Sequence, residues 1–202
     1  MPSLVAPAIA SGSLGASDQP ALPVPGDVLL RPWLHADAAD LMEAFQDPAI
    51  QRWHVRRADS VDEAREWIKG WQNSWLDESA GHWAVVDADS DTLLGRLSLK
   101  SLDLADGKAD VAYWMVPSAR GGGICPRAVT TLASWAFSEA GFYRLELEHS
   151  TANQASCRVA IKAGFEEEGI RRGAALHADG WHDMHLHARV RQDCKMTPRS
   201  PS

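Results

Sequence analysis

An arginine followed by three successive glycines is the first stretch whose residue types could carry chemistry. In VAYWMVPSARGGGICPRAV, residues 111–129, Arg120 precedes Gly121, Gly122 and Gly123, and a helix-like pattern follows. Free N–H groups at a helix start, together with the positive end of the helix dipole, bind anions such as phosphate. Glycine lets the backbone close around an anion, and arginine adds a charged donor. The stretch therefore predicts an anion site, and a tight turn that binds nothing is the alternative.

The glycine stretch does not match two common nucleotide-binding loops. GGGICP, residues 121–126, lacks the Gly-Lys-Ser/Thr ending of a P-loop and the Gly-x-Gly-x-x-Gly spacing of a dinucleotide-binding turn. Pro126 falls in the expected first helical turn, where its missing N–H matters least. The sequence therefore argues against Mg-nucleotide hydrolysis.

A second pair of polar residues lies further along the chain. In TANQASCRVAIKAGF, residues 151–165, Asn153 and Ser156 are three residues apart, on one face near the expected start of a helix. Either residue alone is more often a helix cap than part of a site. Both interpretations stay open at this point.

Several histidines gather in LHADGWHDMHLH, residues 176–187. His185 and His187 alternate in an expected strand and share one face, as two metal ligands can. No cysteine or acidic cluster completes a ligand set convincingly. We therefore expect no metal, and interpret the segment as a hairpin wall near an acceptor groove.

The elements that must position these residues alternate between strands and helices. Hydrophobic spacing and turn residues give the order β-α-α-β-β-β-α-β-α-β-β, which predicts a mixed α/β (α+β) domain with about seven strands and about four helices. The expected strands are 27–33, 82–88, 92–102, 108–116, 143–150, 165–175 and 181–190, and the expected helices are 35–47, 60–77, one that Gly141 ends, and 151–164.

Composition excludes several classes of function. The net charge is −7 with no long basic cluster, which argues against nucleic acid binding and favours a cationic acceptor. No apolar run approaches the roughly 20 residues that cross a bilayer, so no membrane partner is expected. Cys125, Cys157 and Cys194 show no C-x-x-C spacing, which predicts a reducing compartment, the cytoplasm.

The chain divides into three parts by composition. Residues 1–26 are rich in Ala, Pro, Ser and Gly, and Asp18 is their one charged side chain. They lack the basic start of a secretory signal. We expect a flexible leader at 1–26, one folded domain at 27–193 and a flexible tail at 194–202.

Residues 27 to about 190 resemble the GNAT superfamily of acyl-CoA N-acyltransferases, and most of all the branch of ribosomal-protein N-terminal (serine and alanine) acetyltransferases. The resemblance rests on DVAYWMVPSARGGGI, on the pattern N-x-x-S-x-x-V-x-x-K-x-G-F that begins at Asn153, and on DPAIQRW at 47–53. It implies the GNAT fold, acetyl-CoA as acyl donor, and an amine acceptor, either a protein N-terminus or a small molecule. Separately, the chain has nine tryptophans, and a surface rich in them would favour a homodimer.

The resemblance also implies where coenzyme A binds. The family signature Arg-x-x-Gly-x-Gly/Ala maps onto Arg120, Gly123 and Cys125, whose turn would hold the pyrophosphate through backbone amides. The strand before it would bond the pantetheine arm through its backbone. The implied coenzyme A residues are Tyr113, Trp114, Met115, Arg120, Gly121, Gly122, Gly123, Ile124, Cys125, Asn153 and Ser156.

Catalytic roles follow from the same resemblance. A backbone N–H near Met115 would bond the thioester carbonyl oxygen, and Ser156 would protonate the leaving thiolate. Asp110 would take the amine proton, with an exposed strand-end charge as the alternative. The acceptor pocket is expected at Trp53, His54 and Trp83.

Three residues depart from the family pattern. Cys125 replaces a small Gly or Ala, Pro126 removes a possible phosphate donor, and Cys157 follows Ser156 where thiols are rare. We interpret Cys157 as packing rather than as a nucleophile, because the family transfers acyl groups directly. The departures keep a second function open, a coenzyme A-binding regulatory module with weakened catalysis.

Overall fold

The computed structural model describes residues 4–192, so the tail expected at 194–202 lies outside the described residues. The strands are β1 (Leu22–Val24), β2 (Val28–Pro32), β3 (Gly81–Asp87), β4 (Leu93–Asp103), β5 (Lys108–Met115), β6 (Arg144–Ser150), β7 (Glu166–His177) and β8 (Gly180–Val190). The α-helices are α1 (Ala38–Ala44), α2 (Pro48–Gln51), α3 (Val61–Leu76), α4 (Ile124–Ser138) and α5 (Gln154–Lys162), with 3-10 turns at His35–Asp37 and Pro117–Ala119.

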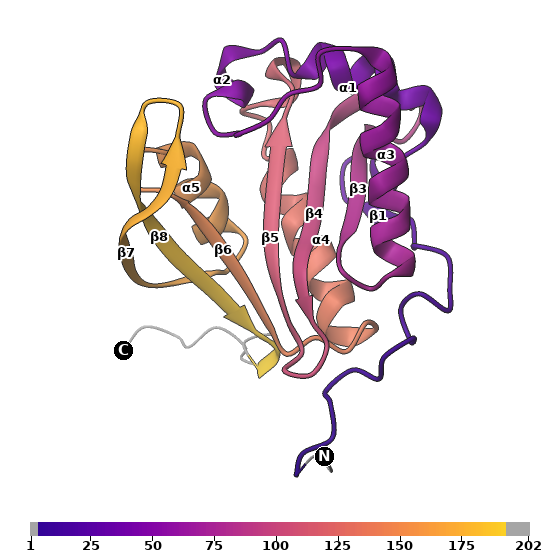
Figure 1. The fold of residues 1–202 in the computed structure, drawn as a ribbon, viewed down its shortest axis with the longest axis vertical. Coiled ribbons are helices and arrows are strands. Elements are labelled where there is room, and N and C mark those ends of the chain that lie inside the picture. Colours follow the sequence, from indigo (N-terminus) through magenta and orange to yellow (C-terminus); the bar gives the residue numbers. More distant parts are fainter. Residues whose placement is uncertain (1–3, 193–202) are drawn as a thin grey trace.

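One eight-stranded sheet runs through the domain in the order β1-β2-β3-β4-β5-β6-β8-β7 (Figure 1). Neighbouring strands are antiparallel except β5 and β6, which are parallel. The predicted mixed fold and element order are confirmed. The additions are β1, within the range expected to be a leader, and α2, which begins at Pro48 where the sequence indicated only a helix end.

The parallel pairing of β5 with β6 is short. Three registered pairs run from Lys108–Arg144 to Asp110–Glu146, although both strands continue beyond them. Figure 1 shows β6 leaning away from β5 past this point. Within the described residues, one edge of β5 therefore has no registered partner strand over its second half.

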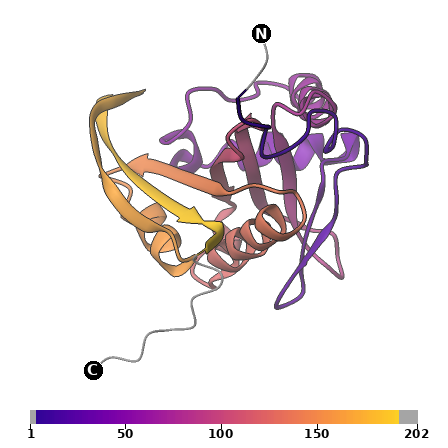
Figure 2. The same cartoon turned by 90° about the horizontal axis from the view of Figure 1, so that it is seen from below.

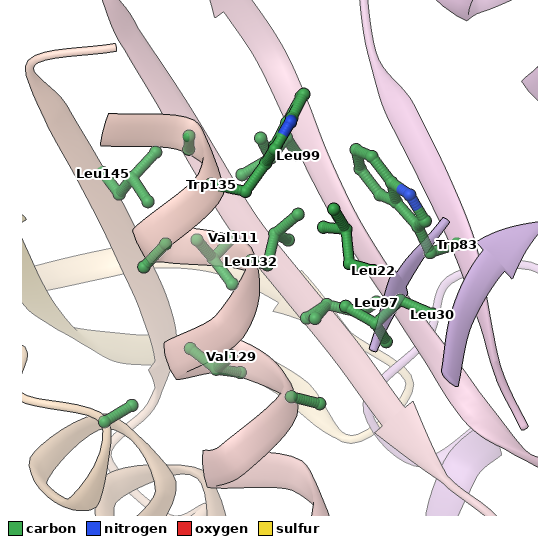
Figure 3. Packing of buried hydrophobic residues seen from close by; sticks show 14 of the residues in the cluster. Leu22, Leu30, Trp83, Leu97, Leu99, Val111, Val129, Leu132, Trp135 and Leu145 are labelled. Carbon is green, nitrogen blue, oxygen red and sulfur yellow. The ribbon is translucent and has the colours of Figure 1, made fainter. Parts of the chain in front are cut away.

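Helices α4 and α5 lie on one face of the sheet, and α1 and α3 lie on the other (Figure 2). Under α4, Val129 and Leu132 point at the sheet beside Leu97 and Trp83 (Figure 3), as their predicted helical spacing requires. Leu132 is fully buried, and burial of such a side chain contributes about 1.5–3 kcal/mol. This cluster fixes α4, and with it the turn that precedes α4.

A second cluster fills the opposite face. Leu41 of α1, Phe45 just after this helix, Ile68 of α3 and Trp114 of β5 belong to it. Phe45 meets Trp114 edge-on with ring centroids 5.8 Å apart. Helix α3 begins at the predicted cap, because Ser60 Oγ accepts from the Glu63 amide at 3.1 Å. This packing therefore holds α1 and α3 against the C-terminal end of β5.

The segment before β2 lies on the domain instead of extending from it. Ile9 and Leu14 are buried in the core cluster, and the amides of Gly12 and Leu14 donate to the Glu78 carboxylate at 2.5 and 2.6 Å. These bonds lower the pKa of Glu78. We expected a flexible leader over residues 1–26; in this structure the segment from Ala8 onward makes specific contacts to the domain, and the sheet begins at Leu22, before residue 27.

Candidate active site

The backbone of β5 offers hydrogen-bonding groups where β6 has diverged. In an antiparallel ladder, alternate residues turn both backbone groups to the same neighbour. The Val116 amide donates to β4 at 3.0 Å, and the Trp114 carbonyl oxygen lies against Gly95 of β4. Trp114 and Val116 therefore face β4, whereas Tyr113 and Met115 turn their backbone groups toward β6.

This alternation corrects one residue of the expected pantetheine contact. Tyr113 and Met115 have amides on the open edge, as the family resemblance implied. Trp114 does not, because its backbone pairs with Arg96 of β4 and its side chain lies in the second core cluster. The expected strip of three residues therefore reduces to two.

Arg120 holds the end of β5 in place. Its Nε and Nη2 atoms donate to the Met115 carbonyl oxygen at 3.0 and 2.9 Å, and Nη2 also contacts the Asp47 carboxylate. The guanidinium is thus engaged with protein groups on two sides. The anion site predicted for this stretch rests on backbone amides, and Arg120 positions the strand that leads into them.

The glycine turn has the backbone that the sequence predicted. Gly121 and Gly123 have φ of 83° and 71°, in the left-handed region that glycine adopts without strain. Gly123 is the N-cap of α4, and no side chain of residues 4–192 caps this helix start. An added Cβ on Gly121 or Gly122 would meet nothing within 4 Å. The turn therefore presents an open helix N-terminus that a phosphate can approach.

Two basic residues near this turn were not assigned to the site from the sequence, although Lys162 belongs to the family pattern that begins at Asn153. Arg127 donates from Nη1 to the Gly122 carbonyl at 3.0 Å and from Nε to the Pro25 carbonyl at 3.0 Å. Lys162 of α5 lines the same shallow pocket of about 390 Å³. The signal was available, because Arg127 follows the glycines by one helical turn. The pocket is lined by Pro25, Pro126, Arg127, Thr130, Thr131 and Lys162.

Asn153 and Ser156 divide into a cap and a free hydroxyl. Asn153 Oδ1 accepts from the Ser156 amide at 3.1 Å, so the capping interpretation of Asn153 is confirmed. No hydrogen bond joins Ser156 Oγ to any residue from 4 to 192. The Tyr113 hydroxyl donates to the Ser156 carbonyl oxygen at 3.3 Å, which links β5 to α5. Burial raises the pKa of Tyr113, so this donor keeps its proton.

The first turn of α4 also holds Ile124 and Cys125. Ile124 packs against the core cluster, and Cys125 is buried within it. Burial raises the pKa of the Cys125 thiol to about 12, so it remains protonated near neutral pH. Cys125 therefore contributes a backbone amide to the helix start and no nucleophile.

Asp110 stands at the last registered pair before the strands diverge. Its partners in the ladder are Lys100 on β4 and Glu146 on β6. Residues paired in this way share a face of the sheet, and this face is the one opposite α4. Burial lowers the pKa of Lys100, an effect that Asp110 and Glu148 oppose. The Asp110 carboxylate therefore lies between Lys100 on β4 and Glu146 on β6, where β5 and β6 begin to diverge.

Arg96 lies further along the same face without an acidic partner. Its guanidinium sits over the Trp71 ring at 4.7 Å from the centroid, and its Nε donates to Ser98 Oγ at 2.9 Å. No carboxylate of residues 4–192 lies within ion-pair distance of it. Burial lowers the pKa of Arg96 to about 10, so it stays charged. Beside it, burial lowers the pKa of His82 to about 3.

The three residues expected to line the acceptor pocket lie in different surroundings in the structure. Trp53 meets the rings of His177 and His182 at 5.7 and 6.0 Å, so the segment after α2 contacts the β7–β8 hairpin. His54 bonds the Ile50 carbonyl through Nδ1 at 2.7 Å, and burial lowers its pKa. The prediction for Trp83 is wrong, because this side chain is 0% exposed in the core under α4.

A family model for the acetyltransferase (GNAT) domain matches residues 27–166. This chain belongs to the GNAT acetyltransferase family. It is 32% identical to a putative ribosomal N-acetyltransferase, YdaF, of Bacillus subtilis over 61% of this chain and 66% of that protein. It is 28% identical to the ribosomal-protein-serine acetyltransferase of Escherichia coli, over 65% and 72% of the two chains.

Solved GNAT structures share the fold. RimL, a ribosomal L7/L12 alpha-N-protein acetyltransferase in complex with coenzyme A, superimposes with a TM-score of 0.79 at 21% identity, over 85% of this chain and 98% of that one. The microcin C7 self-immunity acetyltransferase MccE, in complex with acetyl-CoA and AMP, gives 0.76 at 18% identity, over 82% and 93%. As a GNAT member, this chain is an N-acetyltransferase.

The residues of the site fit acetyl-CoA. The amides of Tyr113 and Met115 lie on the open edge of β5, where an extended pantetheine arm would pair, and a pyrophosphate would meet the amides at the start of α4. Arg127 and Lys162 supply positive charge beyond it. No helix of residues 4–192 is long and apolar enough to cross a membrane.

Proposed function

We propose that this chain transfers the acetyl group of acetyl-CoA to the α-amine of a protein N-terminus. The observation that carries the proposal is the continuity between the unpaired edge of β5 and the glycine turn that begins α4. Together they form one path of backbone donors ending at a helix dipole. The named activities of the relatives support the choice of a protein N-terminus.

Acetyl-CoA supplies an activated carbonyl carbon whose C–S bond breaks as the new C–N bond forms. The Met115 amide donates to the carbonyl oxygen as negative charge develops on it. Asp110 accepts the proton that the attacking amine loses, directly or through one water. Ser156 Oγ, which has no partner among the described residues, donates a proton to the departing thiolate.

Arg96 indicates that the acceptor has an oxygen-bearing group close to its amine. A charged guanidinium that rests on Trp71 and has no described carboxylate partner binds a carbonyl or carboxylate oxygen well. A peptide presents such oxygens close to its α-amine. Arg96 thus favours a peptide N-terminus over a simple polyamine, whose other groups are cationic.

A cytoplasmic location and a homodimer belong to the same proposal. Cys125 and Cys157 are free thiols, which suits a reducing compartment. Ile170, Leu176 and Trp181 are exposed apolar side chains on the β7–β8 hairpin, a surface that a second copy of the chain would cover.

The test is acetyl transfer to peptides, followed by mass spectrometry. Peptides that begin with Ser or Ala should gain one acetyl group at the α-amine, and the same peptides with a blocked N-terminus should gain none. The Arg96→Gln variant should raise the peptide KM without changing affinity for acetyl-CoA. If only small amines react, the acceptor class is wrong. If acetyl-CoA binds and no amine reacts, the chain is instead a coenzyme A-binding regulatory module.

A further inference from the structure

Four side chains of metal-binding types meet between α5 and the sheet, and none of them is assigned a role in acetyl transfer. They are His149 on β6, Cys157 on α5, and His185 and His187 on β8. One ligand atom from each lies within 4.8 Å of the other three. From the sequence, His185 and His187 had no cysteine to complete a ligand set, because Cys157 lies 28 residues before His185. The fold of α5 against the sheet brings it there.

The spacing of one pair within the group is close to that of two ligands in tetrahedral coordination. His149 Nε2 and His187 Nε2 are 3.2 Å apart. Two nitrogens bound to one zinc ion at about 2.0–2.1 Å lie about 3.4 Å apart in tetrahedral geometry. Three imidazoles and one thiolate form the N/S ligand set typical of zinc. We propose that His149, Cys157, His185 and His187 bind one Zn²⁺ ion.

The surrounding contacts orient the rings for this role. His149 Nδ1 donates to the Ser150 carbonyl oxygen at 2.8 Å, which fixes the tautomer and leaves the Nε2 lone pair facing the group. His185 turns Nε2 toward Glu167 Oε1 at 3.9 Å, and its Nδ1 is buried without a hydrogen bond in the described chain. A bound ion satisfies a buried nitrogen that otherwise costs free energy.

The ion would tie α5 to the sheet. His149 and His187 are buried, while Cys157 and His185 are partly exposed, so the group is not closed off from solvent. Cys157 directly follows Ser156 and lies in the first turn of α5. Zinc at this position would hold the helix start that carries the Ser156 hydroxyl. The proposal stands whether or not the acetyl acceptor has been identified correctly.

The experiment uses the full chain without an affinity tag, stripped of metal by a chelator and dialysed. Zn²⁺ should bind with a stoichiometry of one and raise Tm. Co²⁺, used as a coloured substitute, should give tetrahedral d–d bands and a thiolate-to-cobalt charge-transfer band. The Cys157→Ala variant should lose this band and the Zn²⁺-dependent rise in Tm. Since Cys157 is partly exposed, this variant should still fold.

Two further variants separate the proposal from its alternatives. Cys194→Ala should keep the charge-transfer band, which assigns the band to Cys157. His185→Ala should weaken Zn²⁺ binding at least about tenfold, because it removes one ligand. Absence of stoichiometric Zn²⁺ binding, or unchanged binding in Cys157→Ala, would overturn the proposal and leave the 3.2 Å approach of His149 and His187 as a hydrogen bond between two imidazoles.

Discussion

The backbone groups and the side-chain hydroxyl of Ser156 have different roles. The Ser156 amide donates to Asn153, and the Ser156 carbonyl oxygen accepts from Tyr113. Among the described residues the Ser156 hydroxyl has no partner, so it is available for proton transfer. Sequence spacing predicted Asn153 and Ser156 on one face of a helix start. It could not assign capping to one and a free hydroxyl to the other, because that depends on side-chain direction.

Replacing Ser156 tests its role as proton donor. Ser156→Ala should lower kcat by about 100-fold or more, since positioned acid catalysis contributes that much, and should leave the Kd for acetyl-CoA unchanged. Ser134→Ala on the exposed side of α4, where the hydroxyl bonds the Thr130 carbonyl, is the matched control. A large loss of acetyl-CoA affinity in Ser156→Ala would show that the residue binds rather than catalyses.

His82 makes the stability of the fold depend on pH. Its folded-state pKa of about 3 lies below the value of about 6.5 in an unfolded chain. The unfolded state therefore binds the proton first, and stability falls as pH drops below about 6.5, by up to about 1.4 kcal/mol per pH unit. His54 and His187 shift in the same direction.

Urea unfolding at several pH values measures this effect. Between pH 6 and pH 4 the wild type should lose stability more steeply than His82→Gln, whose amide can still reach Ser98. Equal slopes for the two proteins would mean that His82 is protonated in the folded state.

At the scale of elements, the start of α2 contacts the end of β5. This contact links the part of the site proposed for the amine acceptor to the part proposed for acetyl-CoA. Asp47 Oδ1 caps α2 through the Ala49 amide at 3.0 Å, while its other oxygen contacts Arg120, which holds the Met115 carbonyl. The sequence predicted Arg120 as a phosphate donor, since it could not show that the carbonyl of Met115 and the carboxylate of Asp47 lie within reach.

The Arg120→Gln variant tests this positioning role. Loss of the bonds to Met115 and Asp47 should raise KM for the peptide and for acetyl-CoA several-fold together, because both sites share this anchor. Asp47→Asn, which keeps the α2 cap and removes the charge, should raise the peptide KM more than the acetyl-CoA KM. An effect of Arg120→Gln on acetyl-CoA alone would restore the phosphate-donor interpretation.

The predicted elements hold because their signals are local. The glycines of the turn, the Ser60 cap and the spacing of Val129 and Leu132 each act within a few residues. What the sequence missed depends on distant contacts: the core position of Trp83, and the proximity of Cys157 to the histidines. Trp83 illustrates the limit, since alternation in a strand buried on both faces does not reveal which cluster each side chain joins.

At the scale of the whole molecule, the N-terminal segment supports the same core as α4. Glu78 accepts from the amides of Gly12, Leu14 and Gly15, and Trp75 Nε1 donates to the Ser17 carbonyl at 2.8 Å. An alanine- and proline-rich composition predicts flexibility. Composition cannot show that three amides of this segment donate to one carboxylate more than sixty residues away.

Glu78→Gln should lower the free energy of unfolding by about 1–2 kcal/mol, because charge-assisted hydrogen bonds to three amides become weaker. Thermal or urea unfolding measures the loss. Glu66→Gln, on the exposed side of α3, is the control and should change little. If both variants match the wild type, the segment does not contribute to stability as these contacts indicate.

The central claim is that the glycine turn binds the pyrophosphate of acetyl-CoA, and calorimetric titration of acetyl-CoA tests it most directly. Gly122 lies outside the left-handed region and an added Cβ there meets nothing, so Gly122→Trp should fold normally and occupy the phosphate position. Gly70→Trp, at an equally open glycine on α3, is the matched control. We predict micromolar binding by the wild type and Gly70→Trp, and at least about 100-fold weaker binding by Gly122→Trp, about 2.8 kcal/mol. Equal binding by all three proteins, or no binding by the wild type, would contradict the account.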